Sequence, residues 1–258
     1  MSEEKVKFPT EIIELPSRGW VYPEDSPLYS GTVELKYPTA TDEDILTSKI
    51  LIQKGIVLDR FIESIFVGDS KLIGDMVLGD YDKVIMAARI LAYGGDYVTN
   101  VICPNCGEKS ESTINALEWD DKELDEDSYE KGENIFKFTL PTGGQVLTFK
   151  LLTRKDSRDI DIEMKRKKKS LGLKAVNGEI TTRYKRMILE IDGDSNKSAI
   201  STYIEKSLLM RDSRAFRSYL ATIAPSVITG HEFVCDECGH ESYMEVPLDA
   251  NFFWPSTN

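Results

Sequence analysis

The feature that most constrains this chain is a pair of short cysteine units that lie far apart in the sequence. The units are Cys103-Pro104-Asn105-Cys106-Gly107 and Cys235-Asp236-Glu237-Cys238-Gly239. Cys-x-x-Cys-Gly is the pattern of a zinc knuckle, in which one tight turn presents two thiolates and the glycine takes a left-handed backbone conformation. Two knuckles supply the four soft ligands of a closed tetrahedral zinc site. The pattern therefore predicts one structural Zn²⁺, held by Cys103, Cys106, Cys235 and Cys238.

Paired cysteines also form disulfides or thioredoxin-like redox sites, and both alternatives remain open at this stage. The N-terminus is charged from residue 3 and no apolar run is long enough for a membrane span, so we expect a reducing cytosol and no membrane contact. The segments beside the knuckles have strand patterns, which disfavours a redox motif at a helix start. Four thiolates leave no position for water, which disfavours a catalytic zinc. His240, next to the second knuckle, is an alternative ligand.

The charge of the chain bears on whether the knuckles bind nucleic acid. The 258 residues carry a formal net charge of −12, whereas a phosphate backbone requires a basic footprint. One basic run, residues 165–169, follows a stretch that contains acids, and the order predicts the basic end of a charged helix. We therefore expect no nucleic-acid binding. A zinc-ribbon nucleic-acid-binding adaptor remains the alternative function, and a basic face clustered beside the knuckles would favour it.

The pattern of strands and helices predicts an α+β fold with a helical core, β-hairpins and a split zinc ribbon made by the two knuckles. A strand over residues 32–37 precedes Thr41 and Asp44, and a strand over 146–152 precedes Thr153 and Asp156, with the spacing of a helix cap. Each half then runs through helices to a knuckle, which predicts an internal duplication. The expected organisation is an extended arm over 1–30, a first half over 31–117, an acidic linker over 118–134 and a second half over 135–258.

The arm is punctuated by prolines and has no helical or strand period. Proline fixes φ and removes a donor, so we expect residues 15–28 to be extended. Trp20, Tyr22 and Leu28 are nevertheless large apolar groups that need cover. Two interpretations stand side by side: these side chains fold back over the domain, or they bind another protein. We assign Trp20, Tyr22 and Leu28 as candidate partner-binding residues.

The arm motifs Leu15-Pro16-Ser17-Arg18-Gly19, Tyr22-Pro23 and Ser26-Pro27-Leu28 are followed by residues 31–35 and Thr41-x-x-Asp44-Ile45-Leu46-Thr47. This arrangement resembles the baseplate hub proteins of T-even-type tailed phages, and the stretch 87–94 and the Cys-Pro-Asn-Cys unit fit it. The resemblance covers residues 10–120. It implies a non-enzymatic protein, either a virion subunit or a hub assembly factor, that is built in the host cytoplasm and binds other hub or tail proteins. Its oligomeric state stays open.

The residues themselves agree with a protein that is not an enzyme. We find no Gly-rich phosphate loop and no Ser-His-Asp arrangement, and the chain has only 2 histidines for acid–base chemistry. A metal-dependent hydrolase is a third alternative, less favoured than the hub protein and the nucleic-acid adaptor. It would need a zinc with an open coordination position. Zinc is the single cofactor that the sequence predicts.

Overall fold

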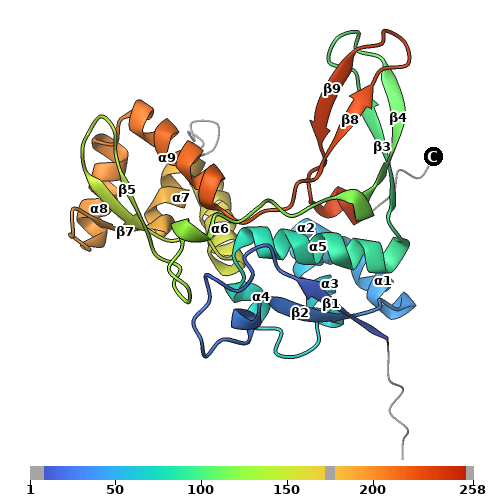
Figure 1. The fold of residues 1–258 in the computed structure, drawn as a ribbon, viewed down its shortest axis with the longest axis horizontal. Helices are drawn as coiled ribbons and strands as arrows, with labels where there is room; N and C mark the ends of the chain where they lie inside the picture. Colours follow the sequence, from blue (N-terminus) through green and yellow to red (C-terminus); the bar gives the residue numbers. More distant parts are fainter. Residues whose placement is uncertain (1–8, 172–177, 254–258) are drawn as a thin grey trace, which may run out of the picture.

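The computed structural model describes residues 9–171 and 178–253 of the chain. Figure 1 shows three parts: a helical lobe that contains β1, β2 and α1–α5, a second lobe that contains β5–β7 and α6–α9, and a tall pair of hairpins made by β3, β4, β8 and β9. Every sheet is small and antiparallel. The prediction of a mixed fold with a helical core and β-hairpins is confirmed at this level.

The first lobe begins with a two-stranded sheet. Strand β1 (Thr10–Glu14) pairs antiparallel with β2 (Thr32–Lys36), and β2 buries Val33 and Leu35, because alternate residues of a strand face the same side. Five helices follow: α1 (Ala40–Leu46), α2 (Lys49–Lys54), α3 (Val57–Ile65), α4 (Leu72–Asp75) and α5 (Leu78–Tyr93). Helix α5 is the centre of the lobe, and Val84 and Ala88 on its inner face are fully buried.

The second lobe has a three-stranded sheet with β6 in the middle. Strand β6 (Val146–Phe149) pairs with β5 (Phe136–Thr139) on one side and with β7 (Ile188–Ile191) on the other. The helices are α6 (Arg154–Leu171), α7 (Glu179–Met187), α8 (Lys197–Lys206) and α9 (Met210–Ile223). Phe149 and Phe216 pack edge to face at 4.9 Å between ring centroids, which joins β6 to α9.

Each lobe ends in a hairpin, and the two hairpins pack against each other. The first consists of β3 (Asp96–Ile102) and β4 (Lys109–Asn115), and the second of β8 (Gly230–Val234) and β9 (Glu241–Glu245). A small apolar cluster of Val101, Phe233, Cys103 and Cys235, with Met244 beside it, lies between them. The cluster is separate from the main core. The hairpins are therefore held together at their knuckle end by few apolar side chains.

Both lobes run from a pair of antiparallel strands through helices to a knuckle hairpin, and the first connection is alike in detail. Strand β1 leads into Leu15-Pro16-Ser17-Arg18-Gly19, and β5 leads into Leu140-Pro141-Thr142-Gly143-Gly144. Gly19 and Gly144 both have left-handed φ values, +80° and +78°. In each lobe, the third residue of the long final helix is a buried aspartate, Asp80 or Asp212, that accepts backbone N–H bonds from this loop.

The helix caps after β2 and β6 also match. Thr39 and Asp42 form a capping box in which Asp42 accepts bonds from the backbone N–H and the hydroxyl of Thr39. Thr153 and Asp156 form the same arrangement at the start of α6, as the sequence predicted. The predicted cap at Thr41 with Asp44 is wrong by two residues. An ion pair from Lys36 to Asp42, at 3.6 Å between Nζ and Oδ2, helps to fix the observed start.

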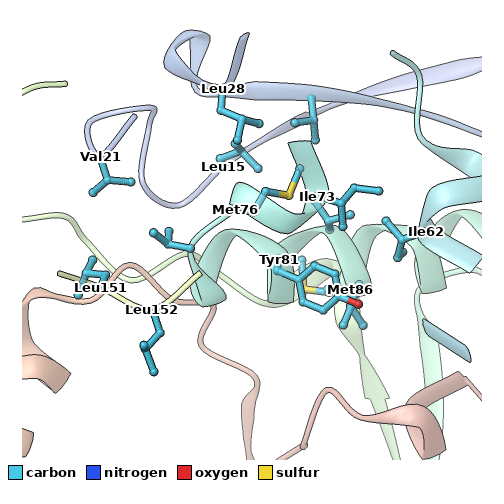
Figure 2. Close-up of a cluster of buried hydrophobic side chains, with 14 of the residues drawn as sticks. Leu15, Val21, Leu28, Ile62, Ile73, Met76, Tyr81, Met86, Leu151 and Leu152 are labelled. Carbon is cyan, nitrogen blue, oxygen red and sulfur yellow. The ribbon is translucent and has the colours of Figure 1, made fainter. Parts of the chain in front are cut away.

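The described part of the predicted arm, residues 9–30, belongs to the first lobe. It contains β1 and a short 3-10 helix, η1 (Pro27–Ser30), so it is not extended throughout. Figure 2 shows Leu15, Val21 and Leu28 in the same apolar cluster as Ile73 and Met76. The segment predicted to be an acidic linker over 118–134 likewise buries three apolar side chains, Trp119, Leu124 and Tyr129.

Candidate metal centre

The four cysteines of the two knuckles converge at the tips of the paired hairpins. Their sulfur atoms all lie within 4.8 Å of one another. The Sγ atom of Cys103 is 3.7 Å from that of Cys238, and the Sγ atom of Cys106 is 3.6 Å from that of Cys235. All four side chains are free thiols. Each short approach joins one knuckle to the other, so neither hairpin could form this cluster alone.

Both knuckles adopt the same turn. The N–H of Gly107 donates to the carbonyl of Cys103, and the N–H of Gly239 donates to the carbonyl of Cys235, at 2.9 and 2.8 Å. The two glycines have φ values of +76° and +67°, the left-handed conformation that the Cys-x-x-Cys-Gly pattern predicted. In each knuckle the first cysteine is buried and the second is exposed. The site therefore has a closed inner side and a solvent-facing outer side.

Backbone and side-chain donors favour the thiolate form at Cys103 and Cys238, whereas burial and the neighbouring thiols raise the pKa of Cys106 to about 12, against the backbone N–H of Glu108. The N–H of Cys106 lowers the pKa of the Cys103 thiol to about 6, and the N–H of Asn105 acts in the same direction. The side-chain amide of Asn105 donates to the Sγ atom of Cys238 at 3.6 Å and lowers its pKa. Since a metal binds the thiolate, a lowered pKa reduces the cost of removing the proton at neutral pH.

The donor set and its spacing fit a tetrahedral metal ion. Zinc–sulfur bonds of about 2.3 Å place neighbouring sulfur atoms about 3.8 Å apart at the corners of a tetrahedron. The two close approaches of 3.6 and 3.7 Å agree with this spacing. Among the described residues, the cluster of potential metal ligands consists of Cys103, Cys106, Cys235 and Cys238. The arrangement can therefore hold a metal ion with four thiolates and with no coordination position left for water.

The two histidines lie near the knuckles but outside this cluster. His240 contributes its backbone carbonyl, which accepts the N–H of Cys235 at 2.9 Å. The Nε2 atom of His231 is 3.4 Å from the hydroxyl of Ser112, between the two hairpins. Neither imidazole belongs to the group of potential ligands. The alternative in which His240 replaces a cysteine has no geometric support in the described chain.

The candidate partner-binding residues of the arm lie in unlike surroundings. Leu28 is 1% exposed and Tyr22 is 4% exposed, so both face the protein's own core. Trp20 is half-buried, with the Lys131 ammonium 5.6 Å from its ring centroid. The buried positions of Tyr22 and Leu28 agree with the interpretation in which the arm folds back over its own domain. Burying both side chains there removes their apolar surface from water. Trp20 is the one of the three that is still accessible to a partner.

A buried carboxylate holds the arm in place, and the sequence did not point to this role. Asp80 accepts hydrogen bonds from the N–H and hydroxyl of Ser17 and from the phenol of Tyr22, whose oxygen also accepts the N–H of Val77 at 3.0 Å. Burial raises the pKa of Asp80 to about 6, against the opposing effect of these donors. Asp80 is the third residue of α5, which begins at Leu78.

The basic run of residues 165–169 lies on α6, in the second lobe. Lys167 forms an ion pair with Glu163 at 2.7 Å, one helical turn away, as expected for a charged helix. Figure 1 places α6 among the helices of the second lobe and the knuckles at the far tips of the hairpins. The run 165–169 therefore lies away from the knuckles and does not supply the basic face beside them that would favour a nucleic-acid adaptor.

Comparison with known proteins gives one family. A family model described as T4 bacteriophage base plate protein matches residues 25–254, which is most of the chain. No curated protein matches, and no solved structure matches. Among the helices of the described residues, none has the length and apolar character that would let it cross a bilayer.

Proposed function

The chain belongs to the family of T4 bacteriophage base plate proteins, and we propose that it is a non-enzymatic component of the hub of a phage tail baseplate. The observation that carries this proposal is the family match over residues 25–254, since it runs from η1 to η5 (Ala250–Phe253) and includes both hairpins and the helices of both lobes. The chain would bind other hub or tail proteins after its synthesis in the host cytoplasm. As a virion subunit it would stay in the tail, and as an assembly factor it would leave.

We further propose that the four cysteines bind one structural Zn²⁺. The support is the donor set: four sulfur atoms within 4.8 Å, two of them buried, with backbone and amide donors around them. Zinc binding to such sites is worth roughly 10–16 kcal/mol in small peptides, comparable with a whole domain's stability of about 5–15 kcal/mol. The ion would fix the two hairpins, and through them the two lobes, in one arrangement.

The third proposal is that the chain arose by internal duplication, with the two knuckles as a split zinc ribbon at the join. Three matched details support it: the Leu-Pro-Ser/Thr loop with its left-handed glycine, the buried aspartate that receives the loop, and the Thr–Asp capping box. A shared ion between the copies would make each half depend on the other. The result is a scaffold in which two similar lobes form one unit.

The assembly role is tested by producing the phage's other tail proteins in host cells with and without this chain. We expect hub assembly to stop without the chain and to resume when purified wild-type protein is added to an extract of these cells. Complete baseplates are counted by electron microscopy. Mass spectrometry of finished particles then distinguishes a subunit from an assembly factor. Complete baseplates in the absence of the chain would overturn the proposal, and strongly salt-dependent binding to duplex DNA would support the adaptor instead.

A further inference from the structure

An apolar groove lies between α7 and α9 of the second lobe, where these helices meet the start of α5 from the first lobe. It encloses a cavity of about 270 Å³. Met187 and Leu220 line it from the two helices, Leu152 from the segment after β6, and Leu78 from the start of α5. Two guanidinium groups, Arg183 and Arg217, also belong to its wall. Small apolar cavities with a few charged groups are typical of sites that receive a side chain or a small ligand.

The matching position in the first lobe is the space between α3 and α5. The register of the sheets sets the match for the first helix, because Phe66 pairs with Leu35 after α3, and Ile188 pairs with Phe149 after α7. The buried aspartates set it for the second helix, since each is the third residue of α5 or α9. By this register, Phe61 corresponds to Arg183, and Arg89 corresponds to Ala221.

In the first lobe, two aromatic rings from the end of the chain occupy this space. Phe252 and Phe253 lie in the short helix η5 (Ala250–Phe253), and both rings are buried. The ring of Phe253 packs edge to face on Phe61 at 5.2 Å between centroids. The guanidinium carbon of Arg89 lies 5.8 Å from the ring centroid of Phe252. The first groove is thus filled by adjacent aromatic side chains on one short segment.

The second groove has no such filling from the described residues. Ile180, which lines it, is 48% exposed, whereas Leu58, at the matching position of α3, is half-buried and packs on the core. The second groove also differs in charge, because the positions that match Phe61 and Ile85 carry Arg183 and Arg217. The surrounding sequence is basic as well: residues 137–217 contain 19 lysines and arginines against 10 acidic residues, a net charge of +9 in a chain of net −12.

We propose that the groove between α7 and α9 binds a segment of another protein that carries adjacent aromatic side chains and at least one acidic residue. The filled groove of the first lobe supplies the model for the aromatic pair, and the two arginines supply the reason for the acidic residue. The inference concerns the chemistry of this surface and goes beyond the proposed hub role, because it holds for any partner with such a segment.

The probe is a peptide with the sequence of residues 247–253, Pro-Leu-Asp-Ala-Asn-Phe-Phe, amidated at its end and labelled with a fluorophore. We expect anisotropy titration with the full chain to show saturable binding. Ala221→Trp, which fills the groove from an exposed position, should weaken binding at least tenfold, and Ile180→Lys should do the same. Met210→Lys is the matched control on α9, because Met210 is 90% exposed and lies outside the groove.

A second peptide, with asparagine in place of its aspartate, tests the role of the arginines. We expect this peptide to bind two- to threefold more weakly, and the difference to shrink as the salt concentration rises. Binding that neither groove variant affects, or no binding at millimolar peptide, would overturn the proposal. Dimers of the chain that Ala221→Trp abolishes, detected by native mass spectrometry, would instead assign the groove to a second copy. None of these outcomes depends on baseplate assembly, so they can fail independently of the proposed function.

Discussion

Both lobes run from a pair of antiparallel strands through helices to a knuckle hairpin, but they are completed in different ways. In the first lobe, the connection from β1 to β2 runs from Leu15 to Gly31 and buries Val21, Tyr22 and Leu28, and the end of the chain adds Phe252 and Phe253. In the second lobe, the corresponding connection is only the turn from Leu140 to Gln145, and the groove on α7 and α9 stays open. Two similar lobes thus differ in their grooves. The filled groove of the first lobe stabilises the fold, whereas the open groove of the second lobe is free to bind a partner.

The largest effect is expected when one candidate metal ligand is removed, from either hairpin in turn. Cys106→Ser and Cys238→Ser should lower the bound zinc equally, because a closed site needs all four thiolates. We expect each to lose several kcal/mol of stability and so lower the Tm by about 10 °C or more, at about 2–4 °C per kcal/mol. Elemental mass spectrometry and calorimetry measure both effects.

The control for the cysteine pair is Asp236→Ala, an exposed knuckle residue that supplies no ligand. It should leave the zinc content at one per chain. Full zinc content in either serine variant would contradict a site shared by the two hairpins. A large effect from one hairpin and none from the other would show that the halves are not equal partners in the metal centre.

The next test empties the filled groove of the first lobe. Phe253→Ala should cost about 3–5 kcal/mol, because its ring is fully buried against Phe61 and its loss leaves a cavity. For comparison, Ile180→Ala in the wall of the open second groove should cost less than about 1 kcal/mol, since this side chain is half exposed. Urea unfolding of both variants gives the two values, and equal costs would remove the distinction between a filled and an open groove.

A third test uses pH, because burial raises the pKa of Asp80 to about 6. A carboxyl whose pKa is higher in the folded than in the unfolded chain contributes stability that is fully present below about pH 4 and is lost as the pH rises through 6. At about 1.4 kcal/mol per pKa unit, the loss is about 3 kcal/mol at most. Asp80→Asn should remove this part of the slope, as measured by urea unfolding from pH 4 to 7. An unchanged slope would mean that Asp80 does not titrate in this window.

The smallest test compares the two capping boxes. Thr39→Ala and Thr153→Ala should each cost about 1 kcal/mol, because each removes the hydroxyl that donates to the aspartate of a capping box, at the start of α1 or of α6. Thr41→Ala is the control, since α1 is capped at Thr39, and it should change the stability by less than about 0.5 kcal/mol. Chemical denaturation gives the three values. A larger cost at Thr41 would restore the cap that the sequence first suggested.

The knuckles and the caps show how far the sequence could lead. The cysteine spacing predicted the left-handed glycines because this property is local to a five-residue unit, and it predicted the joint cluster because two such units supply the four ligands of one tetrahedral site. The family resemblance predicted the family that the match then showed. The start of α1 was misplaced because Thr39 and Thr41 are both good caps, and the choice depends on Lys36 and Asp42 in space. The sequence thus limited the cap to two threonines, and the ion pair between Lys36 and Asp42 distinguishes them only in the folded structure.

The arm shows what the sequence could not supply. Tyr22 and Leu28 looked equally suited to a partner and to the chain's own core, since both settings bury apolar area. The group that fixes the arm on the core is Asp80, about 60 residues away, whose buried carboxylate accepts hydrogen bonds from the hydroxyls of Ser17 and Tyr22. No pattern near Asp80 signals this role, although its match with Asp212 after the Leu-Pro-Ser and Leu-Pro-Thr loops would have been a clue.

The split between the cysteine pairs also sets an order of events in time. Cys106 and Cys235 stand 129 residues apart in the chain. At a synthesis rate of about 5–20 residues per second, the first knuckle waits roughly 6 to 26 seconds for the second. During that interval a nascent chain has only two thiolates and binds metal weakly. With the proposed four-thiolate site, tight metal binding would therefore begin only after the second knuckle has been made, and a chain cut short before residue 235 would never acquire it.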